Sequence, residues 1–205
     1  SRGVEFLFKK NKVTWIKGTG VLGAGKSVKV TTADGKSEMH TATKALVIGT
    51  GSRVRGLPQA GLELNKTTVI SSDEALVLEK APTSLAIVGA GAVGCEFADV
   101  FSAFGTKVTL IEVMPRILPL EDEDASAEVA RAFKKRGIEV LAAAKLSGTK
   151  VGKDRVTMTI EVGGERKELV ADMVLVATGR AANVENIGLK DVGVQLDDRG
   201  FIKVG

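Results

Sequence analysis

An apolar run passes directly into a glycine-rich turn in Leu85-Ala86-Ile87-Val88-Gly89-Ala90-Gly91-Ala92-Val93-Gly94-Cys95-Glu96. This order predicts a strand, a tight turn and a helix. In Gly-x-Gly-x-x-Gly the first glycine makes the turn, the second lets the backbone approach a pyrophosphate, and the third lets helix and strand pack closely. The helix N-terminus would offer free N–H groups to the phosphates. The expected apolar face of the helix, which stops at Gly105, carries Phe97, Val100, Phe101 and Phe104.

A second predicted strand, Lys107 to Ile111, ends on an acid, Glu112. A carboxylate at that point can accept hydrogen bonds from the hydroxyls of an adenosine ribose. A glycine-rich turn by itself also closes ordinary strand-to-helix connections, so a purely structural turn is the alternative. The agreement of strand, helix, second strand and terminal acid favours nucleotide binding.

Composition narrows the class of protein. The 205 residues are 44% hydrophobic and 26% charged, which is typical of one large or two small globular domains. No apolar run approaches the roughly 20 residues of a membrane span, and the start lacks the apolar region of a signal peptide. We therefore expect a cytoplasmic protein with no membrane partner. The net charge of +4 is dispersed among acids, which does not indicate nucleic acid. The single cysteine, Cys95, excludes an internal disulfide, and no metal site is expected.

The remaining patterns predict an α/β fold, a Rossmann-like parallel sheet with an antiparallel β-meander. Before the glycine turn, strands are expected at 13–16, 27–32 and 38–42, followed by a buried strand at 45–52. A capping box at Ser71-Ser72-Asp73-Glu74 opens a short helix through Leu78. Later elements are a helix at 121–136 that stops at Gly137, a third parallel strand at 138–141, a hairpin around Gly163-Gly164, and a buried strand at 172–180. We expect three segments, 1–56, 57–178 and 179–205.

Two Thr-Gly turns, in Ile48–Ser52 and Val176–Arg180, flank the glycine motif. This combination resembles the pyridine nucleotide-disulfide oxidoreductases, flavoenzymes in which a nicotinamide domain is inserted into an FAD domain. Within that family, Ile111–Pro119 and Asp197–Ile202 are similar to the dihydrolipoyl dehydrogenase branch. The resemblance implies NAD as the cofactor of this chain, with FAD, a homodimer and a 2-oxo acid dehydrogenase complex in the full-length protein. The outer segments, 1–56 and 179–205, would then be partial FAD-domain β-segments.

The resemblance also implies roles for individual residues. The pyrophosphate would be bound by Gly89, Ala90, Gly91, Ala92, Val93 and Gly94. Glu96 would lie near the nicotinamide end, Glu112 on the adenosine ribose, Leu146 beside the adenine and Gly179 near the nicotinamide. Positions that match FAD contacts are Gly20, Thr50, Gly51 and Ser52.

The redox cysteine pair and the histidine-glutamate base of the family have no counterpart in this sequence. Cys95 and His40 are its only cysteine and histidine, and neither position matches those groups. The sequence is therefore interpreted as a middle portion of a flavoenzyme that carries the NAD domain, binds nucleotide and contains no catalytic residue. The alternative is a stand-alone dinucleotide-binding or sensor module without redox chemistry.

Overall fold

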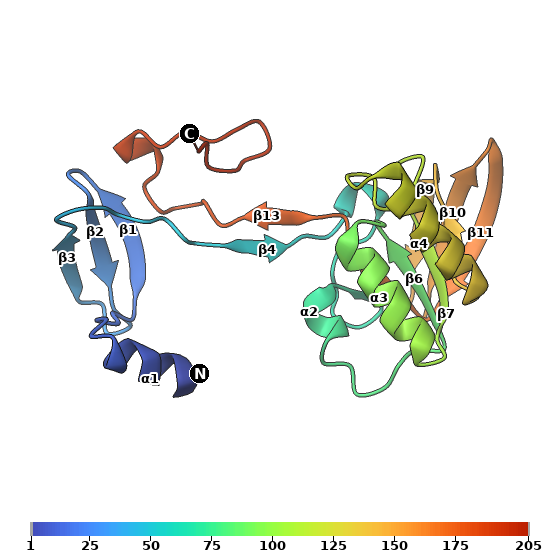
Figure 1. Ribbon diagram of the computed structural model, residues 1–205, viewed down its shortest axis with the longest axis horizontal. Coiled ribbons are helices and arrows are strands. Elements are labelled where there is room, and N and C mark those ends of the chain that lie inside the picture. Colours follow the sequence, from blue (N-terminus) through green and yellow to red (C-terminus); the bar gives the residue numbers. More distant parts are fainter. Residues whose placement is uncertain (1, 205) are drawn as a thin grey trace. The chain divides into compact units, whose positions relative to one another are not determined.

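The computed structural model describes residues 2–204, and the chain forms two compact units (Figure 1). The first unit takes in the chain up to Ser52 and again from Ala182 onward, and the second is Arg53–Ala181. The strands β4 (Ser52–Val54) and β13 (Arg180–Ala182), which lie where the chain leaves one unit for the other, pair as a two-stranded sheet. The three-segment division expected from the sequence stays a prediction.

The first unit contains a helix and the predicted antiparallel meander. Helix α1 (Arg2–Lys10) precedes β1 (Thr19–Gly23), β2 (Ser27–Thr31) and β3 (Ser37–Thr41), which lie in the order β1-β2-β3. A short 3-10 helix, η2 (Lys190–Val192), is formed by the returning chain.

The meander begins later than the sequence predicted. Residues 13–16 form no strand, and Trp15 is 49% exposed. The first strand is β1. The turn after it contains Gly25 and Lys26, both at positive φ, and this turn brings Gly23 opposite Ser27. Gly20 and Gly23 therefore occupy strand positions.

The predicted buried strand at 45–52 is wrong for most of its length. Residues 45–51 take part in no strand ladder among the described residues, and Val47 is 88% exposed. Its apolar composition satisfies the pattern for a buried strand, but a strand forms only where a neighbouring backbone accepts and donates its hydrogen bonds. Pairing starts at Ser52, with β4.

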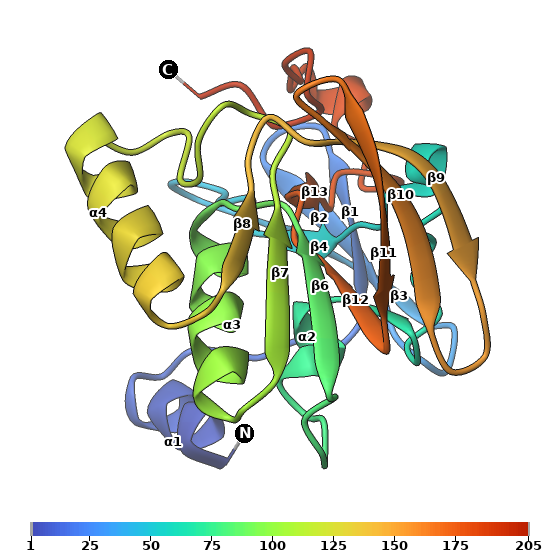
Figure 2. The ribbon, with the colours of Figure 1, turned by 90° about the vertical axis from the view of Figure 1, so that its right-hand side faces the viewer.

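The second unit is built on a parallel sheet of five strands. These lie in the order β5 (Val69–Ile70), β12 (Met173–Val176), β6 (Ser84–Val88), β7 (Lys107–Ile111) and β8 (Glu139–Leu141). Helices α3 (Ala92–Ala103) and α4 (Glu123–Lys135) cover one face, and the antiparallel strands β9 (Lys145–Val151), β10 (Val156–Val162) and β11 (Glu165–Ala171) cover the other (Figure 2). Two short helices, η1 (Pro58–Ala60) and α2 (Ser72–Ala75), complete the unit. This arrangement confirms the predicted α/β fold.

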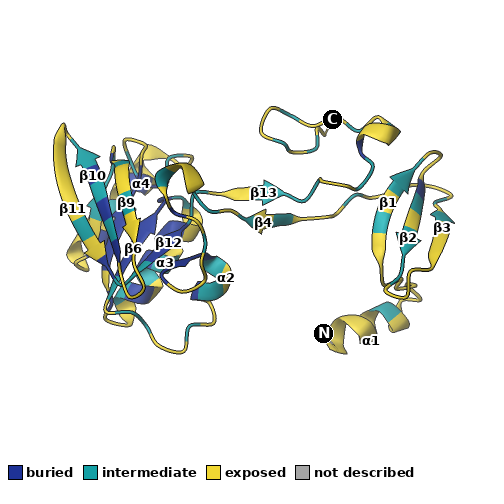
Figure 3. Cartoon of the chain, turned by 180° about the vertical axis from the view of Figure 1, so that it is seen from behind, coloured by how far each residue is buried: buried dark blue, intermediate teal, exposed yellow. Residues whose placement is uncertain are grey.

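The parallel sheet is apolar on both faces and separates two cores, visible as its buried strands in Figure 3. Ile87 and Leu110 pack with Phe101 on the helical side. Val88 packs with Met158 on the side of the antiparallel strands. Each such side chain stabilises the fold by about 1.5–3 kcal/mol when fully buried, so the two cores together hold the sheet in place.

Helix α3 buries part of the predicted apolar face, since Phe101 is buried and Phe97 packs against the core, together with small residues that were not predicted. Its buried residues are Gly94, Cys95, Ala98 and Phe101. Val100 and Phe104 are 45% and 71% exposed. The small residues turn toward the sheet because the start of the helix lies so close to the preceding turn that a Cβ on Gly94 would collide with the carbonyl oxygen of Gly89.

The strands of the antiparallel sheet were predicted only in part. The hairpin is confirmed, since Gly163 and Gly164 both take the positive φ of a type I′ turn. Strand β9 was missed because its charged, small and exposed residues lack a period of two. It pairs with β10 through a register shift between Thr159 and Ile160.

Helix α2 begins at the predicted capping box. The Ser71 hydroxyl oxygen accepts a hydrogen bond from the Asp73 N–H at 3.2 Å, and the Ser71 N–H donates to Glu74 Oε2 at 3.0 Å. The Ser71 hydroxyl also donates to Glu74 Oε2 at 2.6 Å. The helix ends at Ala75, before the predicted Leu78.

We expect Ser71→Ala to lower the free energy of unfolding by about 1 kcal/mol at neutral pH, because the cap is lost. The Ser71 hydroxyl lowers the pKa of Glu74 from its ordinary value of 4.5. The ionised carboxylate therefore stabilises the fold above pH 4.5, and this contribution is lost as the pH falls through the lowered pKa. Urea unfolding at pH 7 and pH 3 should show a smaller penalty at pH 3. Ser147→Ala, at an exposed side chain, is the control, and equal stability of Ser71→Ala and the parent at pH 7 would contradict the cap.

Candidate functional site

The turn after β6 brings three backbone segments into contact. Gly89 has φ of +102°, and a Cβ on it would lie 2.6 Å from the carbonyl oxygen of Ala177. Gly94 is equally restricted by the Gly89 carbonyl. Glycine is therefore required at both positions, since any side chain would separate β6 from β12 or from α3.

Gly91, the middle glycine, faces open space. A Cβ added to it would meet no atom within 4 Å. Gly91 is extended and is the N-cap of α3, where no side chain caps the helix. The N–H groups of Ala92 and Val93, in the first turn, have no carbonyl one turn earlier in the helix. This end of the helix suits an anion such as a pyrophosphate.

Ala90 lies behind the turn and is fully buried. Its N–H donates to Glu112 Oε2 at 2.7 Å, and its carbonyl oxygen accepts from the Leu118 N–H at 2.7 Å. Both backbone groups of Ala90 are thus bonded within the protein. The N–H of Ala90 therefore stabilises the turn and is not available to a phosphate. Contact with a phosphate would come from the N–H groups of the residues after Ala90.

Glu112 is buried, with 7% of its surface exposed. While Oε2 accepts from Ala90, Oε1 accepts from the Met114 N–H at 2.9 Å. Each carboxylate oxygen has two lone pairs, so each keeps one acceptor position for a ribose hydroxyl. The sequence pattern indicated the ribose role of Glu112 but not these two backbone bonds.

The loop after β7 is fixed by hydrogen bonds at several points. The Ser126 hydroxyl of α4 donates to the Ile117 carbonyl at 2.6 Å. The Arg116 guanidinium donates to the carbonyls of Glu121 and Pro119, at 2.9 and 3.4 Å. Arg116, the first cation after Glu112 in the sequence, is therefore engaged by its own loop.

A cavity of about 560 Å³ lies beside the turn, within the second unit. This volume is in the range of small-molecule sites. The walls are mainly apolar and come from the ends of β6, β7 and β12, from β9 and from η1. The lining residues are Leu57, Ala60, Val88, Gly89, Gly91, Ile111, Glu112, Val113, Pro119, Leu120, Ala144, Lys145, Leu146, Ala177, Thr178 and Gly179.

The cavity lies at the switch point of the parallel sheet. From β6 the chain proceeds outward through β7 to β8, and then returns to add β12 on the other side of β6. The strand order therefore reverses between β6 and β12, and a crevice is expected at the carboxyl ends of these strands. Ligands of doubly wound α/β proteins bind in such a crevice.

The structure gathers many of the predicted site residues around this cavity. Gly89, Gly91, Glu112, Leu146 and Gly179 line it. Sequence reasoning missed the lining residues Leu57, Ala60, Val113, Leu120 and Thr178. Val113 and Thr178 lie in stretches that carried the family resemblance, but neither was assigned to the site, and the other three come from segments with no motif of their own.

The other predicted residues lie outside the lining. Ala92, Val93 and Gly94 form the first turn of α3, and Glu96 is exposed on the same helix. The residues predicted to contact a flavin are in the first unit or at its edge: Gly20 in β1, and Thr50, Gly51 and Ser52 at the entry to β4. The assignments of all these residues to a cofactor stay predictions.

The Thr50–Gly51 turn is held by Asn183. The side-chain amide of Asn183 donates to the Thr50 carbonyl at 3.0 Å, and its backbone N–H donates to the Gly51 carbonyl at 3.0 Å. Gly51 has φ of +72°, which is accessible to glycine at little cost. The shape of this turn is therefore set by the returning chain.

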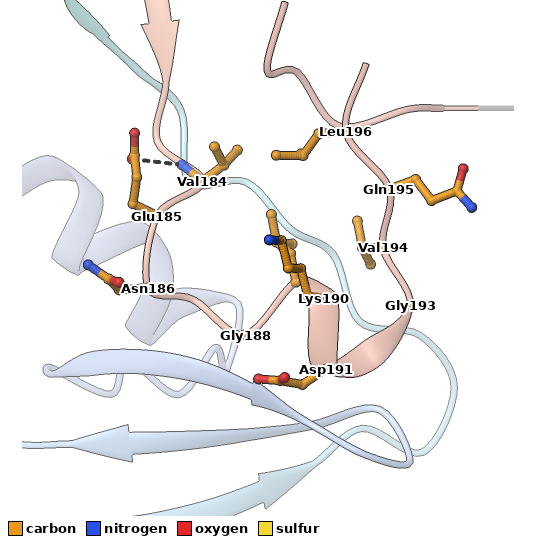
Figure 4. Close-up of a pocket in the computed structure, with 11 residues that line it drawn as sticks. Val184, Glu185, Asn186, Gly188, Lys190, Asp191, Gly193, Val194, Gln195 and Leu196 are labelled. Carbon is orange, nitrogen blue, oxygen red and sulfur yellow. Dashed lines mark hydrogen bonds between the residues drawn. The ribbon is translucent and has the colours of Figure 1, made fainter. Parts of the chain in front are cut away.

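A larger cavity, of about 890 Å³, belongs to the first unit and is lined by residues between Val184 and Leu196 (Figure 4). Lys190 extends toward the space between Val184 and Leu196, while Asp191 points away from it. One continuous segment forms the whole lining, and it contains no glycine turn that leads from a parallel strand into an α-helix. The smaller cavity of the second unit is therefore the better candidate.

Cys95 is buried beneath the turn. Its thiol donates to the Ala90 carbonyl at 3.5 Å. Burial, together with the charge of Glu112, raises the pKa of the thiol to about 11. The thiol is therefore protonated at neutral pH and acts as a packing group.

Neither a metal centre nor a membrane segment is found in the part of the chain that the structure describes. Within residues 2–204, no three side chains of His, Cys, Asp or Glu are placed to hold a metal ion. No described helix is both long and apolar enough to cross a membrane.

Comparisons with known proteins agree with this architecture. The chain is 42% identical over 202 residues to a dihydrolipoyl dehydrogenase of Mycobacterium tuberculosis, covering 98% of this chain and 43% of the relative. It is 40% identical over 206 residues to a dihydrolipoamide dehydrogenase of Chaetomium thermophilum, covering 98% of this chain and 40% of the relative. The chain therefore spans less than half the length of these relatives.

Solved structures show the same fold. LpdA from Mycobacterium tuberculosis matches with a TM-score of 0.87 at 25% identity, over 100% of this chain and 45% of that one. The flavoprotein disulfide reductase RclA from Escherichia coli matches with a TM-score of 0.76 at 26% identity, over 98% of this chain and 46% of that one.

The fold and the crevice define the second unit as a Rossmann-type α/β structure. A family model described as pyridine nucleotide-disulphide oxidoreductase matches residues 1–205. The chain belongs to this family.

Glu112→Gln should lower the free energy of unfolding by about 1–3 kcal/mol even without nucleotide. The amide would place an NH₂ group against the N–H of either Ala90 or Met114 and leave that buried donor without an acceptor. Urea denaturation of the chain without nucleotide measures the effect. Glu96→Gln is the matched control, because Glu96 is exposed on the adjoining helix. Equal stability of the two variants would show that the backbone bonds of Glu112 contribute little.

Cys95 should react slowly with a thiol reagent at pH 7.5 and rapidly after unfolding in urea. Its unfolded pKa is near 9.0 and its folded pKa about 11, so the native state retains the proton longer. Stability should therefore fall as the pH rises from 9 to 11. Cys95→Ala should reduce this pH dependence. Rapid labelling of the native protein at neutral pH would contradict a buried, protonated thiol.

Proposed function

We propose that this chain is the NAD(H)-binding portion of a dihydrolipoyl dehydrogenase-like flavoprotein that oxidises dihydrolipoamide with FAD and NAD. The proposal depends on one observation above others. A single cavity at the carboxyl ends of the parallel strands is bordered by both the glycine turn and the acid Glu112. The family membership and the dihydrolipoyl dehydrogenase relatives support this reading.

The residues of the cavity fit NAD in one orientation, with the adenosine at Glu112 and Leu146 and the nicotinamide toward Gly179. The pyrophosphate would lie over Gly91, where the backbone is open and the N-terminus of α3 offers N–H groups. The adenosine ribose would bond to the remaining lone pairs of Glu112. Leu146 offers an apolar surface to the adenine, and Gly179 borders the nicotinamide end. A bound nicotinamide supplies hydride acceptance, and these residues would hold and orient it.

The same residues favour NAD over NADP. The buried carboxylate of Glu112 would repel a 2′-phosphate on the adenosine ribose. The nearest following cation, Arg116, is bonded to the carbonyls of Pro119 and Glu121 and does not neutralise that phosphate.

The first unit would be part of the FAD domain. Gly20 and the turn Thr50-Gly51-Ser52 would contact the flavin cofactor, and Asn183 already fixes the backbone of that turn. Residues 45–47 form an exposed apolar segment outside any described ladder, a backbone that further chain can pair with. The relatives are more than twice as long as this chain.

The whole flavoenzyme would be a cytoplasmic homodimer that works within a 2-oxo acid dehydrogenase complex. Its redox cysteine pair and histidine-glutamate base are not among these 205 residues, which contain one cysteine and one histidine. The chain by itself would bind nucleotide without catalysing the reaction.

The chain should bind NAD at least about 10-fold more tightly than NADP at low salt, the equivalent of about 1.4 kcal/mol. Calorimetric titrations at two ionic strengths test this, and salt should narrow the difference because it screens the repulsion. Val113→Arg, beside Glu112, should strengthen NADP binding. Val151→Arg, also at an exposed valine, is the control. Equal affinities at low salt would contradict the role of Glu112, and binding of neither cofactor would contradict the proposed function.

A further inference from the structure

Thr178 carries a buried hydroxyl that has no hydrogen-bond partner. Among the described residues, three buried side-chain polar atoms lack such a partner: the hydroxyls of Thr178 and Thr149, and Nε2 of His40. His40 Nε2 has the Glu38 carboxylate at 3.5 Å. Of the three, Thr178 is the one that lines the candidate cavity.

The apolar surroundings of Thr178 make a hydroxyl without a hydrogen-bond partner unfavourable at this position. The wall near it is apolar, with Val88 and Ala177 beside it in the lining. A buried hydroxyl that is left without a partner loses its hydration and gains nothing in return. Valine has nearly the same shape and would fill the same place without that loss. A threonine here is therefore favourable only if something that occupies the cavity completes its hydrogen bonding.

The backbone directs Thr178 toward the cavity side of the sheet. Val174 and Val176 pack into the core that faces β10, whereas Ala177 packs on the helical side. The Ala177 N–H donates to the Val88 carbonyl at 2.8 Å, so the extended pairing continues past the end of β12. Thr178 lies in the bend that follows, at the end of the strand where the cavity opens, and it lines that cavity.

The order of the strands places Thr178 relative to the bound nucleotide. Glu112 follows β7, Gly89 follows β6 and Thr178 follows β12, and these strands are consecutive neighbours in the sheet. The glycine turn therefore lies between Glu112 and Thr178. If Glu112 holds the adenosine ribose and the turn holds the pyrophosphate, Thr178 lies under the other half of the dinucleotide.

We propose that the hydroxyl of Thr178 binds the nicotinamide-ribose half of the dinucleotide and thereby distinguishes NAD from nucleotides that lack this half. The inference rests on the proposed nucleotide-binding function. A hydroxyl both donates and accepts, so it matches either the ribose hydroxyls or the carboxamide of that half. The hydroxyl oxygen is covered in this structure, so this contact would require the side chain to turn to another staggered χ1 rotamer that faces the cavity.

The test compares NAD with ADP, which has the adenosine and the pyrophosphate but no nicotinamide-ribose. Calorimetric titrations use the 205-residue chain and three variants: Thr178→Val, Thr178→Ser and Thr149→Val. Thr178→Val should weaken NAD binding about 3- to 10-fold, the loss of one neutral hydrogen bond, and leave ADP affinity unchanged. Thr178→Ser retains the hydroxyl and should bind NAD like the parent. Thr149→Val removes the other unpartnered threonine hydroxyl, outside the cavity, and should change neither affinity.

The titrations distinguish a failure of the inference about Thr178 from a failure of the proposed function. Unchanged NAD affinity in Thr178→Val, together with a higher melting temperature, would show that the hydroxyl is simply unsatisfied and would overturn the inference. Equal weakening of NAD and ADP would show a structural effect on the whole site and would also overturn it. If the parent chain binds ADP and NAD equally well, the nicotinamide half makes no contact and the inference fails while nucleotide binding stands. If the parent binds neither, the proposed function itself fails.

Discussion

The close approach of three backbone segments at Gly89 is the constraint on which the site depends. The turn lies against Ala177 and Thr178 of the segment after β12, and against Gly94 of α3. A Cβ at Gly89 would meet the Ala177 carbonyl at 2.6 Å, so a larger residue would force the strand ends apart. This contact sets the distance between the two sides of the crevice. It also brings the N-terminus of α3 to the edge of the sheet, where its N–H groups are available to an anion.

Glu112 connects this turn to the rest of the crevice. Its carboxylate accepts from the N–H groups of Ala90 and Met114, while its own N–H donates to Leu141 and its carbonyl accepts from Ala144. One buried residue therefore ties the glycine turn, the loop after β7 and the chain after β8 together. The acid that would recognise the ribose also shapes the site before any ligand arrives. Such preorganisation reduces the ordering that binding must otherwise accomplish.

The antiparallel strands supply the remaining wall. Their apolar residues, among them Met158 and Ile160, pack on one face of the parallel sheet and bury it. Leu146 at the start of β9 is thereby held beside the cavity. The helices α3 and α4 cover the opposite face, so the sheet is enclosed on both sides. The crevice lies at the carboxyl ends of the strands, where the strand order reverses between β6 and β12.

The sequence alone predicted what depends on neighbouring residues: the strand, turn and helix around Gly89, the capping box at Ser71, the hairpin around Gly163-Gly164, and the acid at the end of β7. These features follow from glycine conformations and from periods of two or 3.6, which are local properties of the chain. Only the tertiary structure decided which face of α3 is buried, where the meander begins, that residues 45–51 pair with no described strand, and that β9 forms an edge of the cavity. It also showed the backbone partners of Glu112 and the unpartnered hydroxyl of Thr178. Hydrogen-bond partners and packing neighbours come from segments far apart in the chain, and a local pattern does not contain the identity of a distant partner.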